Sequence, residues 1–150
     1  MATCSVIAPT VAWPIFVQVG VPVPQPTAPK TILVADDNPM IRKVLCEIFE
    51  IEADYEICAE ATNGEEAIAF AKQHKPHLII LDLAMPGGMS GIDAARELKR
   101  IMPQVPIILF TLHADTTVTH ILEQNSPIDL VVAKSDVGNI VKHVRSLLAA

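Results

Sequence analysis

The amino-acid sequence predicts an α/β fold in which a parallel five-stranded sheet carries helices on both faces. Several short runs are wholly apolar, Leu78–Leu81 most clearly, as expected of strands buried on both faces. These runs alternate with segments whose apolar residues recur at helical spacing. An ionisable or hydroxyl side chain follows four of the runs directly, and parallel strands joined by helices end at one edge of the sheet. We therefore expect those polar side chains to meet in one crevice.

The N-terminal half is expected to form two strands and two helices. Thr31–Ala35 is a short apolar strand, and Pro39 opens a helix because its fixed φ suits the first helical position. Four residues of that helix recur on one face: Ile41, Val44, Leu45 and Ile48. Tyr55–Thr62 alternates as a strand and ends in a turn at Asn63-Gly64. Glu65–His74 then forms a second helix with a small apolar face.

The C-terminal half is expected to add three strands and three helices. Leu78–Leu81 is a fully apolar strand, and a Gly-rich loop separates it from a helix at Ile92–Met102. The last strands are predicted at Val105–Phe110 and Ile128–Ala133, with a final helix near Val137–Leu148. A helix at Ala114–Gln124 is weak, because β-branched residues disfavour helix and four occur in about one turn: Thr116, Thr117, Val118 and Thr119.

Composition narrows the class of protein. A chain of 150 residues with 51% hydrophobic and 19% charged residues is typical of one soluble globular domain. The formal net charge of −6 argues against a nucleic-acid surface, and no apolar run is long enough to span a membrane. The three cysteines, Cys4, Cys46 and Cys58, match neither a disulfide framework nor a metal spacing, which indicates reduced thiols and a cytoplasmic protein.

The first 29 residues differ from the rest of the chain. They contain no charged residue and six of the twelve prolines, which disfavours a regular helix or a central strand. A signal peptide is not indicated, because a basic start is missing and Pro14 interrupts the apolar stretch. We therefore predict a flexible, polyproline-like arm over residues 1–29 and a folded domain over 30–150; an over-extended gene start would explain the same composition.

The polar residues at the strand ends suit a divalent cation and a phosphoryl group. Carboxylate oxygens are hard ligands that favour Mg²⁺, and Asp82 follows the most apolar strand, where an unpaired charge is costly. Simpler interpretations exist for each residue. Asp36 or Asp37 could cap the helix that starts at Pro39, and Asp82 could be an ordinary loop acid. Thr111 could be an ordinary strand residue, and Lys134 could do no more than neutralise the acids.

The ordered set of these residues resembles the response-regulator receiver domain of two-component signalling. Its members are Asp36-Asp37, Asp82, Met85-Pro86, Gly91, Thr111 and Lys134. The resemblance covers Lys30 to Ala150 and implies a flavodoxin-like, doubly wound (βα)5 fold with strand order 2-1-3-4-5.

The resemblance also implies the roles of the site residues. Asp82 would accept a phosphoryl group from a histidine kinase or a phosphotransfer protein, with Lys134 offsetting charge and Thr111 binding a phosphoryl oxygen. Mg²⁺ would be bound by four residues: Asp37 and Asp82 directly, Asp36 largely through water, and Ala84 through its carbonyl.

Three departures from the family pattern bear on signal transmission. The loop Met85–Gly91 has an extra glycine, Val131 replaces the usual aromatic residue, and Ser135 replaces a common proline. Because the last helix reaches the C-terminus, we expect a stand-alone receiver that is not an enzyme and that signals through a protein partner or a relay. Two alternatives remain open: a Mg²⁺-dependent aspartyl phosphatase, which would usually need an acid where Ala84 stands, and a receiver-like interaction module that does not use phosphate.

Overall fold

The computed structural model describes residues 22, 24–112, 114–115, 120, 124 and 126–149. This part of the chain contains a five-stranded sheet in which all neighbouring strands are parallel and the order is β2-β1-β3-β4-β5. The strands are β1 (Lys30–Ala35), β2 (Tyr55–Ala61), β3 (Leu78–Leu81), β4 (Ile107–Thr111) and β5 (Leu130–Ala133). The helices are α2 (Pro39–Glu50), α3 (Gly64–His74), α4 (Gly91–Ile101), the 3-10 helix η1 (Lys134–Asn139) and α6 (Ile140–Leu148). The predicted flavodoxin-like fold is confirmed.

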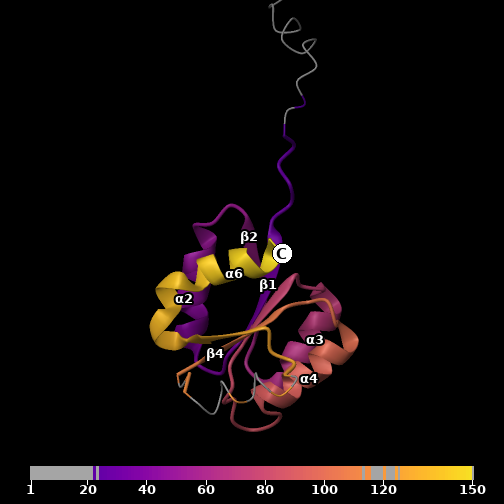
Figure 1. Ribbon diagram of the computed structural model, residues 1–150, viewed down its shortest axis with the longest axis vertical. Coiled ribbons are helices and arrows are strands. Elements are labelled where there is room, and N and C mark those ends of the chain that lie inside the picture. The colour runs from indigo at the N-terminus through magenta and orange to yellow at the C-terminus, as the bar shows by residue number, and fades with distance from the viewer. Residues whose placement is uncertain are drawn as a thin grey trace, which may run out of the picture.

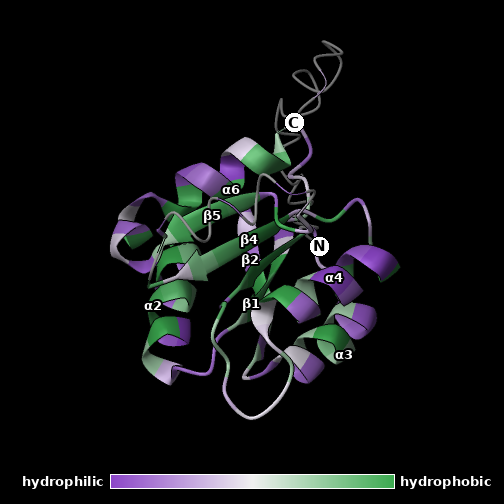
Figure 2. Ribbon diagram, turned by 60° about the horizontal axis from the view of Figure 1, so that its bottom comes forward, coloured by the Kyte–Doolittle hydropathy of each residue, from purple (hydrophilic) through white to green (hydrophobic). Residues whose placement is uncertain are grey.

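In the part of the chain that the structure describes, two helices cover each face of the sheet. Helices α2 and α6 lie on one face and α3 and α4 on the other (Figure 1). Along β1 the side chains alternate, so that Ile32 and Val34 pack toward α2 and α6 while Leu33 and Ala35 pack toward α3 and α4. Because both faces of the sheet are covered, the central strand β3 is apolar and buried throughout, whereas the edge strand β2 has exposed glutamates and the helices have a polar outer side (Figure 2).

Asparagine side chains cap the N-termini of helices α2 and α3. Helix α2 begins at Pro39 as predicted, and the side-chain oxygen of Asn38 accepts a hydrogen bond from the Met40 N–H at 2.9 Å. The turn predicted at Asn63-Gly64 lies one residue earlier, at Thr62 and Asn63, because helix α3 already begins at Gly64. The Asn63 side chain accepts a hydrogen bond from the Glu66 N–H at 2.8 Å and so satisfies a free donor of the first helical turn.

The element boundaries differ most in the C-terminal half. Strand β4 begins at Ile107 rather than Val105, since Pro106 has no N–H to donate, and β5 begins at Leu130 rather than Ile128. The Asp129 carboxylate accepts a hydrogen bond from the Ile107 N–H at 2.8 Å, so a side chain takes the place of a strand partner there. The predicted final helix Val137–Leu148 covers the end of η1 and all of α6, and non-helical backbone angles at Asp136 interrupt η1 itself.

Some expectations lie largely outside the described residues. The predicted helix Ala114–Gln124 and most of the predicted arm Met1–Pro29 are among them. The described residues of the arm, 22 and 24–29, belong to no helix or strand. Across the described ranges, no helix has both the length and the apolar character that crossing a membrane requires.

Candidate functional site

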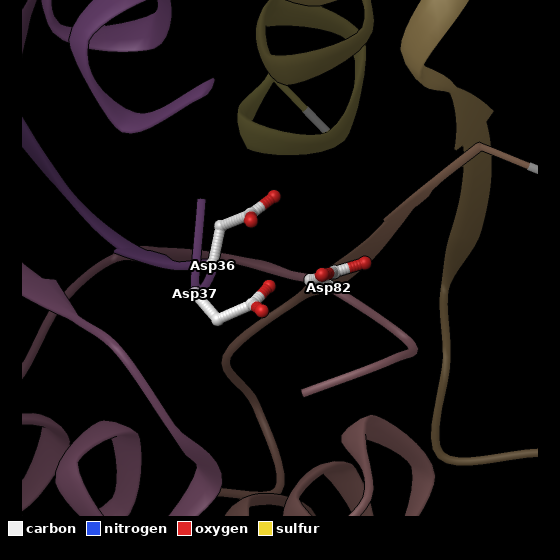
Figure 3. A group of neighbouring side chains, drawn as sticks. All are labelled: Asp36, Asp37 and Asp82. Atoms are coloured by element: carbon white, nitrogen blue, oxygen red, sulfur yellow. The ribbon is translucent and has the colours of Figure 1, made fainter. Parts of the chain in front are cut away.

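Three carboxylates meet where two neighbouring strands end. Asp36 and Asp37 follow β1, Asp82 follows β3, and these strands pair through Ala35 and Leu81. One oxygen of each carboxylate lies within 4.8 Å of the others (Figure 3). Asp36 and Asp82 are 1% and 5% exposed, and Asp37 is open to solvent. The cluster thus has two buried carboxylates and one that is accessible to solvent.

The backbone holds the two buried aspartates rigidly. The Asp82 N–H donates to the carbonyl of Ala35 at 2.9 Å, and the Asp36 N–H donates to the carbonyl of Ala61 at 3.0 Å. Each residue therefore continues the hydrogen-bond ladder by one step beyond its strand. Because Asn38 caps helix α2, capping does not account for either Asp36 or Asp37.

Lys134 brings the only cation within ion-pair distance of these carboxylates among the described residues. Its Nζ lies 2.7 Å from Oδ2 of Asp36 and 3.4 Å from Oδ1 of Asp82, and its side chain is 8% exposed. The contact with Asp36 is an ion pair without hydrogen-bond geometry, so this buried oxygen has no hydrogen-bond partner. One ammonium is paired with two of the three carboxylates, which leaves the cluster with an excess of negative charge.

The excess negative charge and the burial act on Asp82. Burial, and after it the charge of Asp36, raise the pKa of Asp82 from 3.8 to about 6, although Lys134 and the N–H of Ala84 act in the opposite direction. Like charges alone would lead us to expect a raised carboxylate pKa in this cluster. The structure shows that desolvation is the larger cause.

Thr111 and Ala84 complete the set of predicted site residues. Thr111 is the last residue of β4, is 4% exposed, and is paired in the sheet with Ala133, directly before Lys134. Ala84 is exposed, and its N–H lies 3.4 Å from Oδ1 of Asp82. The structure thus places a hydroxyl residue beside the lysine and a backbone N–H beside the central carboxylate. A role for the Ala84 carbonyl as a metal ligand stays a prediction.

Gly91 has a structural role that its position in the motif does not reveal. A Cβ at this residue would lie 2.1 Å from the carbonyl oxygen of Asp82, a distance that real side chains do not adopt. The Gly91 N–H also donates to the carbonyl of Leu83 at 3.0 Å. Helix α4 therefore begins directly against the backbone that carries Asp82, and only glycine allows this approach.

The Gly-rich loop is held by a glutamate that the sequence did not single out. Oε1 of Glu65, in the first turn of α3, accepts a hydrogen bond from the Met89 N–H at 3.2 Å. In the same loop Gly87 has a φ of 87°, which favours glycine, and a Cβ on Gly88 would meet the Glu65 carboxylate at 2.9 Å. The additional glycine thus belongs to a loop that is tied to α3.

Comparison with known proteins identifies relatives of one kind. The sequence model of the response regulator receiver domain matches residues 32–145. The chain is 45% identical over 85 residues to the transcriptional regulatory protein PdtaR of Mycobacterium tuberculosis, which covers 55% of this chain and 40% of that protein. It is 41% identical over 80 residues to the chemotaxis protein CheY of Thermotoga maritima, which covers 53% of this chain and 65% of that protein. The aligned regions are thus less than two thirds of these relatives.

Solved structures agree with this result. A LuxR-family two-component response regulator from Aurantimonas sp. SI85-9A1 matches with a TM-score of 0.73 and 27% identity, over 81% of this chain and 86% of that one. A CheY-like receiver domain protein from Methanospirillum hungatei JF-1 matches with a TM-score of 0.71 and 23% identity, over 81% and 94% of the two chains. The second likeness shows the fold alone.

Proposed function

The chain belongs to the response regulator receiver domain family, and from this premise we propose that it accepts a phosphoryl group on Asp82. One observation carries the proposal: the buried Asp82 carboxylate lies among two further aspartates and 3.4 Å from the Lys134 ammonium, at the carboxyl edge of the sheet. Ligands of open α/β sheets bind at that edge. Relatives in this family are signalling proteins, and phosphorylation and magnesium are typical of them.

The residues present fit a magnesium ion. Three carboxylates with oxygens within 4.8 Å of one another form an oxygen-donor set of the kind that hard cations prefer. Oδ2 of Asp36 is buried and makes an ion pair with Lys134 at 2.7 Å but no hydrogen bond with good geometry, so it keeps acceptor capacity. We propose that the ion is held by Asp37 and Asp82, by Asp36 largely through water, and by the carbonyl of Ala84. When bound, Mg²⁺ supplies positive charge for the oxygens of the transferring phosphoryl group.

The remaining chemistry is performed by the side chains of the chain itself. A carboxylate oxygen of Asp82 attacks the phosphorus, the bond from phosphorus to a histidine nitrogen of the donor breaks, and the nitrogen keeps the electron pair. The product is an acyl phosphate on Asp82. The Lys134 ammonium offsets negative charge on the phosphoryl oxygens, and the Thr111 hydroxyl donates a hydrogen bond to one of them.

The class of phosphoryl donor is inferred from the family, and the kind of output is part of the proposal. The expected donor is a histidine kinase or a histidine phosphotransfer protein, and the output is binding of a protein partner or transfer of the phosphoryl group in a relay. In this scheme the protein is no enzyme beyond its own phosphorylation and dephosphorylation, and it works in the cytoplasm. A stand-alone arrangement and the absence of nucleic-acid binding stay predictions, since PdtaR is a transcriptional regulatory protein that extends beyond the aligned region.

The two alternative functions have less support. A phosphatase with an aspartyl nucleophile usually needs an acid two residues after it, and that position is Ala84. A module that does not use phosphate would be consistent with Val131, which packs at the edge of the core where the family usually has an aromatic residue. That module would have no need of three clustered carboxylates at a cost in stability, so phosphorylation is the better-supported function.

The test is incubation of the protein with Mg²⁺ and acetyl phosphate, followed by mass spectrometry to find the modified residue. We expect one phosphoryl group, on Asp82, and none in Asp82→Asn. Asp54→Asn, which removes an exposed carboxylate away from the site, serves as the matched control and keeps the modification. Phosphate on a histidine, or modification that persists in Asp82→Asn, would rule the proposal out.

A further inference from the structure

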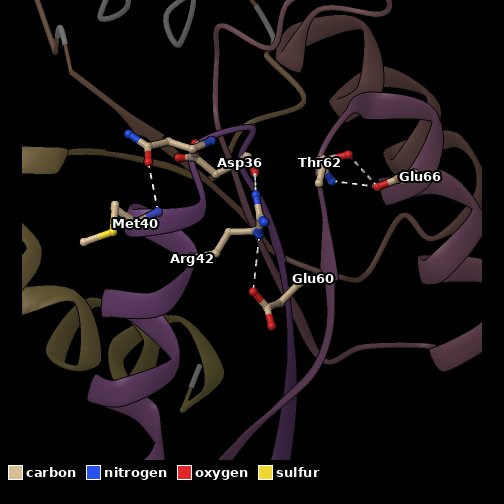
Figure 4. A network of polar contacts seen from close by, with 7 residues as sticks. Asp36, Met40, Arg42, Glu60, Thr62 and Glu66 are labelled. Atoms are coloured by element: carbon tan, nitrogen blue, oxygen red, sulfur yellow. Dashed lines mark hydrogen bonds and ion pairs between the residues drawn. The ribbon is translucent and has the colours of Figure 1, made fainter.

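Arg42 joins the acidic cluster to the edge of the sheet. It lies in the first turns of α2, where its Nη1 donates a hydrogen bond to the backbone carbonyl of Asp36 at 2.7 Å. Its Nε lies 3.3 Å from Oε1 of Glu60, a residue of β2, and the Arg42 side chain is 17% exposed (Figure 4). One guanidinium thus spans three segments: the loop that carries the aspartates, a helix and a strand.

The bond to Asp36 fixes a particular peptide group. The carbonyl of Asp36 and the N–H of Asp37 belong to one planar peptide unit, so holding the carbonyl oxygen also sets the direction in which the chain leaves Asp36. The other side of Asp36 is already held, because its N–H donates to Ala61. Beyond the end of the strand ladder, Arg42 holds the Asp36 carbonyl and the Asn38 N–H donates to Oδ1 of Asp36 at 2.8 Å, so Asp37 lies between two held groups.

We propose that Arg42 is a positioning residue for the metal site, acting through the Asp36–Asp37 peptide and held in place by Glu60. This inference rests on the proposed function, in which Asp37 and Asp82 hold Mg²⁺. Arginine suits the task because its planar fork presents several N–H donors in a rigid geometry, so that two acceptors on different segments are bound at once. Lysine has one compact ammonium on a flexible stem and cannot reproduce this arrangement.

Positioning and simple electrostatics predict opposite results for the loss of Arg42. A guanidinium close to the cluster repels a cation, so removing its charge alone should tighten Mg²⁺ binding. If Arg42 orients the ligands, its removal weakens binding instead, by roughly tenfold as for other residues that orient metal ligands from outside the first shell. The sign of the change therefore separates the two explanations.

The experiment is a MgCl₂ titration followed by the NMR amide shifts of Asp37 and Asp82, in the parent and in variants. We expect Arg42→Gln to raise the Kd for Mg²⁺ by about tenfold and Arg42→Lys to raise it as well although the charge remains. Lys43→Gln removes a positive charge from the next residue of α2, whose partner is Glu47. Arg145→Gln breaks an arginine–glutamate pair with the same 3.3 Å distance at Glu52. Both control variants should keep the Kd of the parent.

Each outcome bears on a defined claim. An unchanged or lower Kd in both Arg42 variants, with the parent binding Mg²⁺ normally, overturns the positioning role and leaves the proposed function intact. A rise in the Kd of Lys43→Gln as large as that in Arg42→Gln also overturns it, because the effect would then be one of helix α2 as a whole and not of the Arg42 contacts. If the parent itself binds no Mg²⁺ near Asp37, the proposed function fails and this inference with it.

Discussion

Replacing Asp82 with asparagine should make the metal-free protein more stable at neutral pH. Asparagine has nearly the same shape as aspartate but does not ionise, so the substitution removes a charge from a site that is 5% exposed. The folded pKa of Asp82 is raised from 3.8 to about 6, a difference of about two units, which corresponds to ~3 kcal/mol. The charge on this residue therefore costs the folded state up to that amount.

The sign of the effect fixes its pH dependence. As the pH rises above 3.8, the unfolded chain loses the Asp82 proton first, while the folded chain keeps it until the pH approaches 6. In that interval the unfolded state binds fewer protons, so the free energy of unfolding falls as the pH rises. The stability gained by Asp82→Asn should thus be absent below pH 3.8, grow between the two values and be complete above pH 6.

The measurement is urea unfolding of both proteins in EDTA at a series of pH values, with Asp54→Asn as the control for loss of one negative charge. With m between about 1 and 3 kcal/mol/M, the predicted difference moves the midpoint by roughly 1 to 3 M at neutral pH. Adding Mg²⁺ should stabilise only the parent, by ~2.7 kcal/mol at a hundredfold excess over Kd. A gain that is equal at all pH values would show a packing effect, and no gain at neutral pH would refute the assigned burial cost.

Three further predictions concern other residues of the structure. Lys134→Met removes the cation that faces two buried carboxylates. The free energy of unfolding at neutral pH should fall by ~3–5 kcal/mol and be largely recovered with Mg²⁺. A loss of stability that Mg²⁺ leaves unchanged would indicate a packing effect instead. Gly91→Ala places a Cβ 2.1 Å from a backbone oxygen, so it should lower the free energy of unfolding by ~1–3 kcal/mol and slow phosphorylation by acetyl phosphate. Gly138→Ala is the control, because the space around Gly138 is open, and it should have neither effect. Burial, then the charge of Glu60, raise the pKa of Cys46 to about 11, so iodoacetamide should modify this thiol at pH 8 roughly a hundredfold more slowly than a free thiol. Glu60→Gln should speed the reaction. Peptide mass spectrometry measures the modification, and fast modification of the parent would contradict the prediction.

The sequence alone was sufficient for the fold class and for the residues that gather at one edge of the sheet. Apolar runs, helical periodicity and the proline before α2 are local signals, and each depends only on neighbouring residues. The boundaries were less predictable wherever a side chain replaces a strand or turn contact. Asp129 at the start of β5 and Asn63 at the start of α3 are the clearest examples.

Tertiary structure decided how the site residues are paired and held. The sequence places Lys134 among three acids, but the tertiary structure determines that its Nζ lies closer to Asp36 than to Asp82, at 2.7 against 3.4 Å. It also determines that Gly91 touches the backbone of Asp82 and that Arg42 reaches the Asp36 carbonyl. These contacts join segments whose separation is set by strand spacing and helix packing, which are long-range properties. Local sequence patterns do not predict these contacts, because which groups a side chain can reach depends on where the backbone lies in space.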